Sequence, residues 1–451
     1  MRTCVLLTGV AIFIGCPAAM AADPAVYDLG ACVRAALEHS PDLAAAAADL
    51  AGARARLAEA AAGRYGHSEY HQVLGLVNEA RGSVLSSPDR KNDFFSGLGP
   101  FTRLELEINI PLWTFGKLDA ALKAAQEALQ SERAQNEVRR TEVVLSTQQL
   151  YYGLLLSRQL SGVLHDMLDT MDTAINKTQR RLDTGSSAVT ELDLLKLKVG
   201  RATFVKGTLE VDAAVGLTRS ALARTIGVAV ESEFDIADRK LQPVNAHIAS
   251  LDTYLEDGPD RRPESRQLRT GVAAQAAKLG LEEASYYPTV FVSTGVGYAR
   301  ADNRTEQDNP FASDEFNFIR PVGVLGLHWD LNFFMTGAKV AQARADLDRL
   351  LAQQRAAASG LRLEIRRAYA AVLQGRDTIT AADDGRKAGR ALLILSVANF
   401  DLGIGEPEEL FKALGAYTEA STDYFRAVHD YNLAVAALGK AVGIELTALA
   451  Y

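Results

Sequence analysis

The chain has 451 residues and a formal net charge of -8, with 48% hydrophobic and 23% charged residues. This composition excludes an intrinsically disordered chain and a helical protein that crosses a membrane many times. The negative charge argues against a nucleic-acid-binding surface.

The first elements in chain order are the features of an export signal over residues 1–21. Arg2 precedes an apolar core from Val5 to Ile14, and Ala19-Met20-Ala21 is a small-residue cleavage motif. The mature chain is therefore expected to begin near Ala22. A second possibility is that Cys16 becomes a lipidated N-terminus after cleavage in front of it.

Cleavage near Ala22 removes two of the three cysteines and leaves only Cys32, so no internal disulfide is expected. After the signal there is no apolar run of about 18 residues, the length that a membrane-spanning helix needs. If the mature chain crosses a membrane, we expect strands rather than helices to do so.

The first half of the mature chain opens with helix and strand signals. Ser40-Pro41-Asp42-Leu43 begins an alanine-rich helical pattern that ends at Arg64-Tyr65. Residues 67–77 alternate weakly between apolar and polar, with three polar residues on one face. The apolar residues of this segment are Tyr70, Leu74 and Leu76, and the polar ones are His67, Glu69 and His71.

Residues 103–112 alternate strictly and predict a second strand after a polar loop at about residues 78–100. One face carries Arg103, Glu105, Glu107 and Asn109, and the other carries five leucine and isoleucine residues. We predict that Glu105, Glu107 and Asn109 face a wet interior.

A very long helix is predicted from about residue 115 to residue 182. No proline occurs between Pro111 and Pro243, and an interior proline would break a helix. Its length is about 100 Å at 1.5 Å per residue, which indicates a coiled coil. The turn Gly185-Ser186-Ser187 and a second helix from Glu191 follow.

The second half has the same plan. A helix begins at Pro263, strands are predicted at residues 289–298 and 323–331 around a polar loop at residues 301–315, and a helix follows from about residue 335 to residue 402. His328 and Asp330 lie on the polar side of the last strand. The turn Gly403-Ile404-Gly405 then leads into a helix from Pro407.

This last helix has a heptad seam, in which apolar residues recur at alternating steps of four and three residues. The seam consists of Leu410, Leu414, Tyr417, Tyr424, Val428, Tyr431, Val435, Leu438 and Val442, with Ser421 in the one gap. We interpret its tyrosines as packing residues rather than as a ligand cage.

Prolines and glycines at the element boundaries recur at corresponding positions in the two halves, which indicates an internal duplication. Pro41 corresponds to Pro263 at an offset of 222 residues, Gly116 to Gly337 at 221, and Gly185 to Gly403 at 218. We therefore predict two structural repeats, residues 22–240 and 241–451, each with helices and two strands. Chance similarity would explain alanine-rich helices but not these matched breaks.

The number of predicted strands indicates that the chain forms an oligomer. Four strands of about ten residues, apolar on one face and polar on the other, are typical of an outer-membrane barrel, but they are too few to close one. Lipid does not tolerate an unpaired strand edge. Three copies would give twelve strands with an aqueous lumen. A soluble sheet packed on one face would show the same alternation.

Several of these segments resemble the TolC family of outer-membrane efflux proteins. They are Ser40-Pro41-Asp42-Leu43, the junction Pro111-Leu112-Trp113-Thr114-Phe115-Gly116, and Gly185-Ser186-Ser187 followed by Glu191-Leu192-Asp193-Leu194. The resemblance covers the whole mature chain. It implies a mainly α fold with a small β part, in which long antiparallel coiled-coil hairpins form a periplasmic tunnel and a homotrimer shares a twelve-stranded barrel.

The same resemblance implies partners and a location. We expect the protein in the outer membrane of a Gram-negative cell, in contact with lipid. There it would be an exit duct for a tripartite efflux pump or a type I secretion system. It would dock to a periplasmic adaptor protein and, through it, to an inner-membrane transporter of the RND or ABC type. The alternative is a periplasmic coiled-coil adaptor or structural protein without a channel.

The resemblance also locates a candidate periplasmic entrance. Glu409 and Lys412 fall where well-known members carry two aspartates, so Glu409 keeps the charge and Lys412 departs from it. Glu406, Glu408 and Glu409 would place nine carboxylates around a threefold axis and attract cations. Acidic residues after a helix-starting Pro407 are also what any helix start prefers. The turns Gly185-Ser186-Ser187 and Gly403-Ile404-Gly405 are the candidate adaptor contacts.

No catalytic motif, cofactor motif or paired-cysteine metal motif was found in the sequence, so we expect neither an enzyme nor a cofactor. His67, Glu69 and His71 share a strand face and would be able to hold a metal ion. Without a further placed ligand, polar lining of a lumen is the simpler interpretation.

Overall fold

The computed structural model describes residues 25–82, 97–185, 189–230, 234–307, 309, 311 and 313–446. The signal peptide predicted at residues 1–21, the alternative at Cys16, and Ser186 and Ser187 of the first turn lie outside the described residues.

Within the described residues, the first half of the chain contains four helices and two long strands, and all of these except α1 follow the predicted order. These are α1 (Leu29–His39), α2 (Pro41–Ala62), a short 3-10 turn (Gly63–Tyr65), β2 (His67–Val77), β3 (Gly99–Trp113), α3 (Lys117–Asp183) and α4 (Glu191–Thr225). The second half follows with α5 (Leu251–Arg261), α6 (Pro263–Ala284), β5 (Thr289–Ala301), β6 (Phe318–His328), α7 (Phe333–Leu402) and α8 (Pro407–Val442).

Corresponding helices of the two halves have nearly equal lengths. Both α2 and α6 have 22 residues, α3 and α7 have 67 and 70, and α4 and α8 have 35 and 36. The predicted duplicated, mainly helical fold is therefore confirmed. The exact division between residues 240 and 241 stays a prediction.

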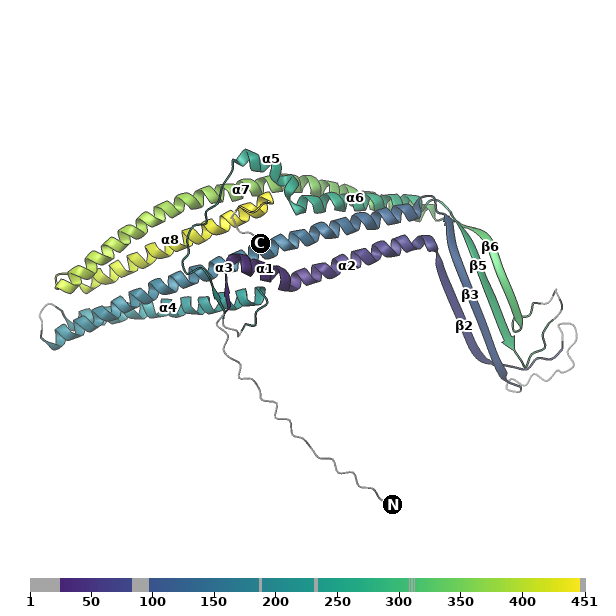
Figure 1. Ribbon diagram of the computed structural model, residues 1–451, viewed down its shortest axis with the longest axis horizontal. Coiled ribbons are helices and arrows are strands. Elements are labelled where there is room, and N and C mark those ends of the chain that lie inside the picture. The colour runs from purple at the N-terminus through teal and green to yellow at the C-terminus, as the bar shows by residue number, and fades with distance from the viewer. Residues whose placement is uncertain are drawn as a thin grey trace, which may run out of the picture.

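The molecule is long and narrow. Figure 1 shows the sheet at one end and the turns of the hairpins α3–α4 and α7–α8 at the opposite end.

Proline and serine set the starts of the helices. Pro41, Pro263 and Pro407 occupy the first turns of α2, α6 and α8, where a missing N–H costs nothing. The Ser40 hydroxyl accepts a hydrogen bond from the Leu43 N–H at the start of α2.

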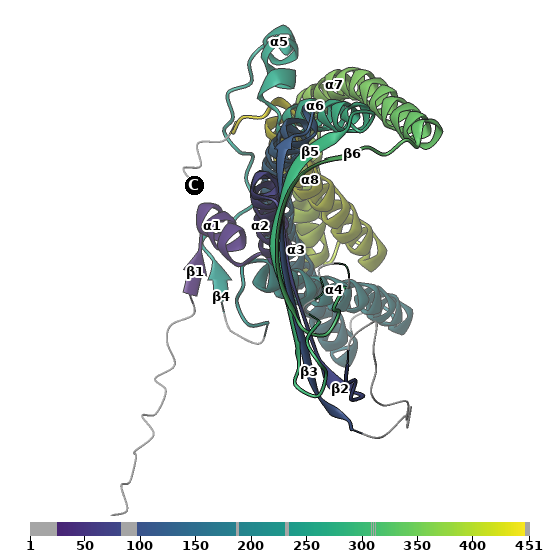
Figure 2. The same cartoon turned by 90° about the vertical axis from the view of Figure 1, so that its right-hand side faces the viewer.

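The four long strands form one antiparallel sheet in the order β2-β3-β5-β6. The central pair β3–β5 joins the two repeats, and Figure 2 shows the sheet as a narrow curved strip. Within the described residues, β2 and β6 each pair on one side only. A single chain therefore has two open sheet edges.

The prediction of the fourth strand at residues 323–331 was wrong at both ends, because β6 spans Phe318–His328. Pro321 lies inside β6, a position that an edge strand tolerates. Beyond His328 the chain leaves the sheet to start α7. Here the Trp329 indole N–H donates to the Tyr286 carbonyl at 3.0 Å and its ring contacts Phe333. Asp330 therefore lies after the strand rather than in it.

The register places the predicted polar residues of all four strands on one face, because directly paired residues of neighbouring strands share a face. Glu107 pairs with Glu69 and with Gly295, and Glu105 pairs with His71 and Gly297. The opposite face is apolar and uncovered within the chain, since Leu74 and Leu325 are both 71% exposed. An uncovered apolar face of this extent is typical of a surface that meets lipid.

Within the described residues, the three largest of four buried apolar clusters hold most of the helices together. One cluster lies where α1, α3, α4 and α8 meet near the middle of the molecule, and it includes the fully buried free Cys32. A second lies between the hairpins near their turns, and a third joins α5, α7 and α8. A short parallel pair, β1 (Ala25–Tyr27) with β4 (Phe234–Ile236), was not predicted from the sequence.

The heptad seam predicted on the last helix is the buried side of α8. The apolar seam residues Leu410, Leu414, Val428, Tyr431, Val435, Leu438 and Val442 are buried, together with Ser421. Tyr417 and Tyr424 are partly buried against the same clusters. Every helix within the described residues is too short or too polar to span a bilayer.

Candidate functional site

The turns at the far end of the two hairpins have the backbone geometry that their glycines allow. Gly185 after α3 has a φ of 72° and Gly403 after α7 has a φ of 78°, values that side-chain-bearing residues rarely adopt. A Cβ on Gly405 would lie 2.9 Å from the Phe400 nitrogen. These glycines are therefore required by the turns themselves, whatever else the turns bind.

The candidate acidic residues lie at the start of α8, beside the second turn. Glu406 is the N-cap residue but its side chain makes no capping hydrogen bond, and Glu408 and Glu409 lie in the first turn. Negative charge here is favourable because it faces the positive end of the helix dipole. This local reason accounts for acidic residues at the start of α8 without requiring any function for them.

Glu408 differs from its two acidic neighbours, because two lysines hold it. The Lys412 ammonium lies 2.9 Å from one carboxylate oxygen and the Lys196 ammonium of α4 lies 3.4 Å from the other. These hydrogen bonds lower the pKa of Glu408, and that of Lys412 is raised by the same contact. Within the described residues, Glu406 and Glu409 form no ion pair. Lys412 thus pairs directly with Glu408 and acts on Glu409 and Glu406 only at longer range.

A second set of contacts, not found from the sequence, ties the two hairpins to each other. The Lys177 ammonium at the end of α3 lies 2.6 Å from the Asp401 carboxylate of α7. The Arg181 guanidinium donates to the carbonyls of Phe400 at 3.1 Å and Asp401 at 2.8 Å. Cations close to the C-terminal carbonyls stabilise a helix end, and here the cation belongs to the neighbouring hairpin.

The apolar cluster behind these contacts packs the hairpins closely. Phe204 of α4 and Phe411 of α8 meet edge to face with ring centroids 6.2 Å apart. A Cβ on Gly200 would lie 2.7 Å from the Phe411 ring, so α4 approaches α8 at a distance that only glycine permits. The hairpin ends therefore have both a packed core and polar links across them.

The barrel-lumen candidates lie at the other end of the molecule. Glu105, Glu107, Asn109 and His328 share the polar face of the sheet, and Asp330 lies two residues past β6. Arg103 pairs with Glu105 at 2.6 Å, and Asn109 donates to Glu107 at 2.9 Å. This face is polar and internally paired, as expected of a wall in contact with water.

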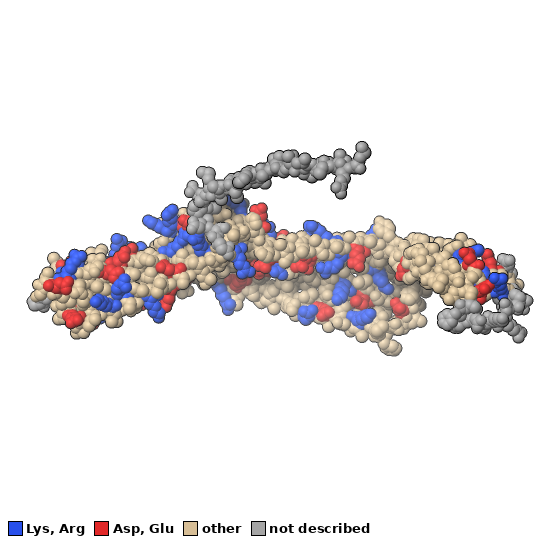
Figure 3. All heavy atoms as spheres, turned by 90° about the horizontal axis from the view of Figure 1, so that it is seen from below, with Lys and Arg blue, Asp and Glu red and all other residues tan. Residues whose placement is uncertain are grey.

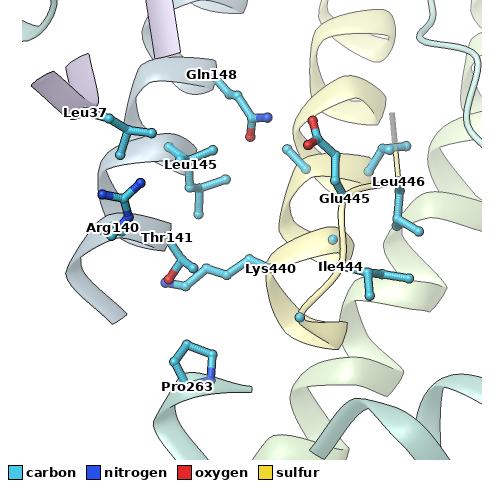
Figure 4. A pocket seen from close by; sticks show the side chains of 15 residues that line it. Leu37, Arg140, Thr141, Leu145, Gln148, Pro263, Lys440, Ile444, Glu445 and Leu446 are labelled. Atoms are coloured by element: carbon cyan, nitrogen blue, oxygen red, sulfur yellow. The ribbon is translucent and has the colours of Figure 1, made fainter. Parts of the chain in front are cut away.

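Charged side chains are also spread along the described helices. Figure 3 shows acidic and basic side chains interspersed along the helices on the face in view. A cavity of about 380 Å³ lies between α1, α3 and the end of α8, and Figure 4 shows Leu37, Leu145, Ile444 and Leu446 around it. Its walls are mainly aliphatic, although Arg140, Gln148, Lys440 and Glu445 also line it, and the Thr141 hydroxyl donates to the Val138 carbonyl. It is therefore a gap between packed helices and not a gathered set of reactive groups.

Comparison with known proteins gives a consistent picture. The sequence matches the family described as outer membrane efflux protein over residues 90–195 and 259–444. Protein CyaE of Bordetella pertussis is 27% identical over 319 residues, which are 68% of this chain and 64% of that protein. The chain thus spans less than two thirds of the length of this curated relative.

Solved structures with the same fold include two outer-membrane proteins. VceC of Vibrio cholerae has a TM-score of 0.71 at 20% identity, covering 93% of this chain and 96% of that one. The CmeC outer membrane channel of Campylobacter jejuni has a TM-score of 0.72 at 15% identity, covering 93% and 86%. At these identities the likeness shows the fold. Together with the family match over more than half of the sequence, it shows that the chain belongs to the outer membrane efflux protein family, located in the outer membrane with helices that extend into the periplasm.

Proposed function

We propose that three copies of this chain form a passive exit duct through which a cell exports molecules across its periplasm and outer membrane. The observation that carries the proposal is the open sheet, which has an apolar uncovered face and two edges that a membrane would leave unsatisfied. Joining β6 of each copy to β2 of the next would close a twelve-stranded barrel. The long helices would then form a tunnel of about 100 Å.

The polar face of the barrel would line its lumen. Glu105, Glu107, Asn109 and His328 point to that side by register. Asp330, just past β6, would lie at the junction between barrel and tunnel. Charged and amide groups in this position are compatible with a water-filled channel and incompatible with a lipid-facing wall.

The hairpin turns are the proposed docking surface for a periplasmic adaptor, which would connect the duct to an inner-membrane transporter of the RND or ABC type. Leu402 and Ile404 are each 76% exposed beside the second turn, and Leu192 is 62% exposed after the first. Exposed apolar side chains next to fixed glycine turns favour a protein partner. The proposed contacts are Gly185, Ser186, Ser187, Gly403, Ile404 and Gly405.

The same end would be the gated entrance. Lys177 and Arg181 hold the ends of α3 and α7 together, and opening would require these links to separate. Of the three acidic residues at the start of α8, Glu406 and Glu409 form no ion pair within the described residues. With Glu408 compensated by lysines, we expect cation attraction to come from Glu406 and Glu409.

The decisive experiment is the native mass of the protein extracted by detergent from isolated outer membranes. A trimer that forms ion-conducting pores in planar bilayers would support the proposal. A monomer recovered from the periplasm would overturn it and favour the alternative, a coiled-coil adaptor or structural protein. Deleting the gene and measuring export of candidate cargo would then identify the transport system.

A further inference from the structure

The start of β2 carries three metal-ligating side chains on the polar face of the sheet. Glu69 lies between two histidines, with the His67 imidazole 3.7 Å from one carboxylate oxygen and the His71 imidazole 3.4 Å from the other. The three side chains are 66%, 57% and 67% exposed, so a solute in the lumen can reach them. Within the described part of a single chain, no group of three such residues is arranged to hold a metal ion.

A fourth ligating side chain lies at the opposite edge of the sheet. His328 is the last residue of β6, its imidazole lies 3.4 Å from Asp330, and its side chain is 70% exposed. The register places His328 on the same face as His67. In one chain the two edges are separated by β3 and β5. In a closed barrel, β6 of one chain would neighbour β2 of the next.

The register also indicates which residues would meet at that seam. Across the sheet His67 is in line with Asn109, Ser293 and Val324, and Val324 lies four residues before the end of β6 at His328. Asn109 and Ser293 also lie four residues from the same end of their own strands, so the strand ends are offset by four residues between β2 and β3 and are level from β3 to β6.

If closure of the tilted barrel adds a further offset of about zero to two residues at the seam, Val324 lies opposite a residue about four to six positions into β2 of the next chain. Residues that share a face differ by an even number, so this residue is His71 or Val73. His328 then lies across from His67 or Glu69, at the distance of directly paired side chains, about 5 Å between Cβ atoms.

We propose that each seam between neighbouring chains forms a binding site for a divalent cation of the Zn²⁺, Ni²⁺ or Cu²⁺ class. Its ligands are His328 of one chain and Glu69 with His67 or His71 of the next. This inference rests on the proposed trimeric barrel. Two imidazoles and one carboxylate are a typical ligand set for Zn²⁺ with an open position for water, and imidazole ligands disfavour Mg²⁺ and Ca²⁺.

Such a site would link the chains, because both sides of the seam supply ligands. Metal binding then adds to the stability of the assembled state.

The test is Zn²⁺ binding by untagged, detergent-solubilised trimer, measured by calorimetry. We expect three equivalent sites per trimer, with at least a tenfold loss of affinity in His328→Ala and in Glu69→Gln. The matched control is His165→Ala, which removes a histidine of α3 that lies 3.7 Å from Asp212 of α4, far from the sheet. Zn²⁺ should also raise the temperature at which trimers dissociate in SDS for the wild type and the control, but not for His328→Ala.

A cysteine pair separates failure of the site from failure of the assembly. Glu69→Cys combined with His328→Cys should give disulfide-linked dimers and trimers under oxidation without metal, since Cys32 is fully buried. Cross-links together with Zn²⁺ affinity that no variant changes would overturn the metal site and leave the duct intact. Absence of both trimer and cross-links would overturn the proposed function and the metal site with it.

Discussion

At the scale of single residues, Arg262 shows how a buried charge is stabilised between helices. Its side chain is 3% exposed and bridges Glu264 at 2.9 Å and Glu364 at 2.5 Å. It thereby links the start of α6 to α7. Removing one partner of a buried ion pair leaves the other charge uncompensated. The exposed pair between Arg269 and Asp260 lies nearby and offers a comparison.

We predict that Arg262→Ala lowers the free energy of unfolding by about 1–3 kcal/mol, because the charge-assisted hydrogen bonds are lost but water reaches Glu264 and Glu364, which are 22% and 47% exposed. Arg269→Ala, the exposed control, is expected to change it by less than about 1 kcal/mol. Urea unfolding of the detergent-solubilised protein measures both. Equal effects of the two substitutions would contradict a special role for burial at Arg262.

The contribution of Glu264 to folding stability depends on pH, and the direction of this dependence follows from its pKa. Burial raises the pKa of the Glu264 carboxyl, but hydrogen bonds from Arg262 outweigh burial, and the pKa lies below its ordinary value. The folded state therefore binds this proton less readily than the unfolded state. The stabilising contribution is complete above the unfolded pKa and is lost as the pH falls through the folded pKa. In Glu264→Gln, the free energy of unfolding should therefore fall less steeply as the pH drops below about 4.3.

Glu409 is the residue on which the entrance proposal is most directly tested. We predict that Glu409→Ala lowers the cation selectivity of single channels and weakens their block by divalent ions, because it removes three carboxylates from the threefold axis. Glu408→Ala should have a smaller effect, since Lys412 and Lys196 already compensate that charge. Unchanged selectivity in Glu409→Ala would restrict this residue to a role in starting α8.

At the scale of elements, helix packing near the turns depends on one glycine. Gly200→Ala places a methyl group against Phe411 and is expected to lower the free energy of unfolding by about 1–3 kcal/mol through overpacking. A Cβ on Gly216, also on α4, would meet open space, with no neighbouring side chain within 4 Å. Gly216→Ala should therefore raise stability by about 0.5–1 kcal/mol. Thermal unfolding of both variants shows whether the close approach of α4 to α8 restricts the size of the side chain at position 200.

The alternating strands predict that neighbouring residues respond oppositely to the same change. Leu106 and Glu107 are adjacent in β3 but lie on opposite faces of the sheet. Leu106→Lys places a charge in lipid, costs about 2–4 kcal/mol near the middle of the bilayer, and should reduce the yield of trimer in outer membranes. Glu107→Lys faces the lumen and should assemble. Equal yields would contradict the assignment of the two faces.

Much of this architecture could be predicted from the sequence, because its signals are local. Proline-free stretches indicated the long helices, the heptad seam indicated the buried side of α8, and alternation indicated the sheet faces. The end of β6 was misplaced because alternation continues through Trp329, whose contacts with Tyr286 and Phe333 are set by the fold. Arg181, Lys177 and Lys196 were missed because their partners lie on another hairpin, more than 200 residues away in sequence.

At the scale of the whole molecule, the two hairpins are held together at the end farthest from the sheet. We predict that Arg181→Ala increases the open time of single channels by on the order of tenfold, because it removes charge-assisted hydrogen bonds to the end of α7. Arg180→Ala, one residue earlier on α3, is the matched control. Planar bilayer recording measures the effect, and equal open times for the two variants would mean that Arg181 does not restrain opening.

The two open sheet edges also have a genetic consequence. Each chain would supply one β2 and one β6, so a ring of three has three seams, and every seam depends on two different chains. A chain with a damaged edge but intact helices can still join wild-type partners and leave the ring incomplete. If both forms are made equally and mix at random, only about one trimer in eight contains no mutant chain. Edge mutations are therefore expected to be dominant, whereas mutations that unfold the chain before assembly are expected to be recessive.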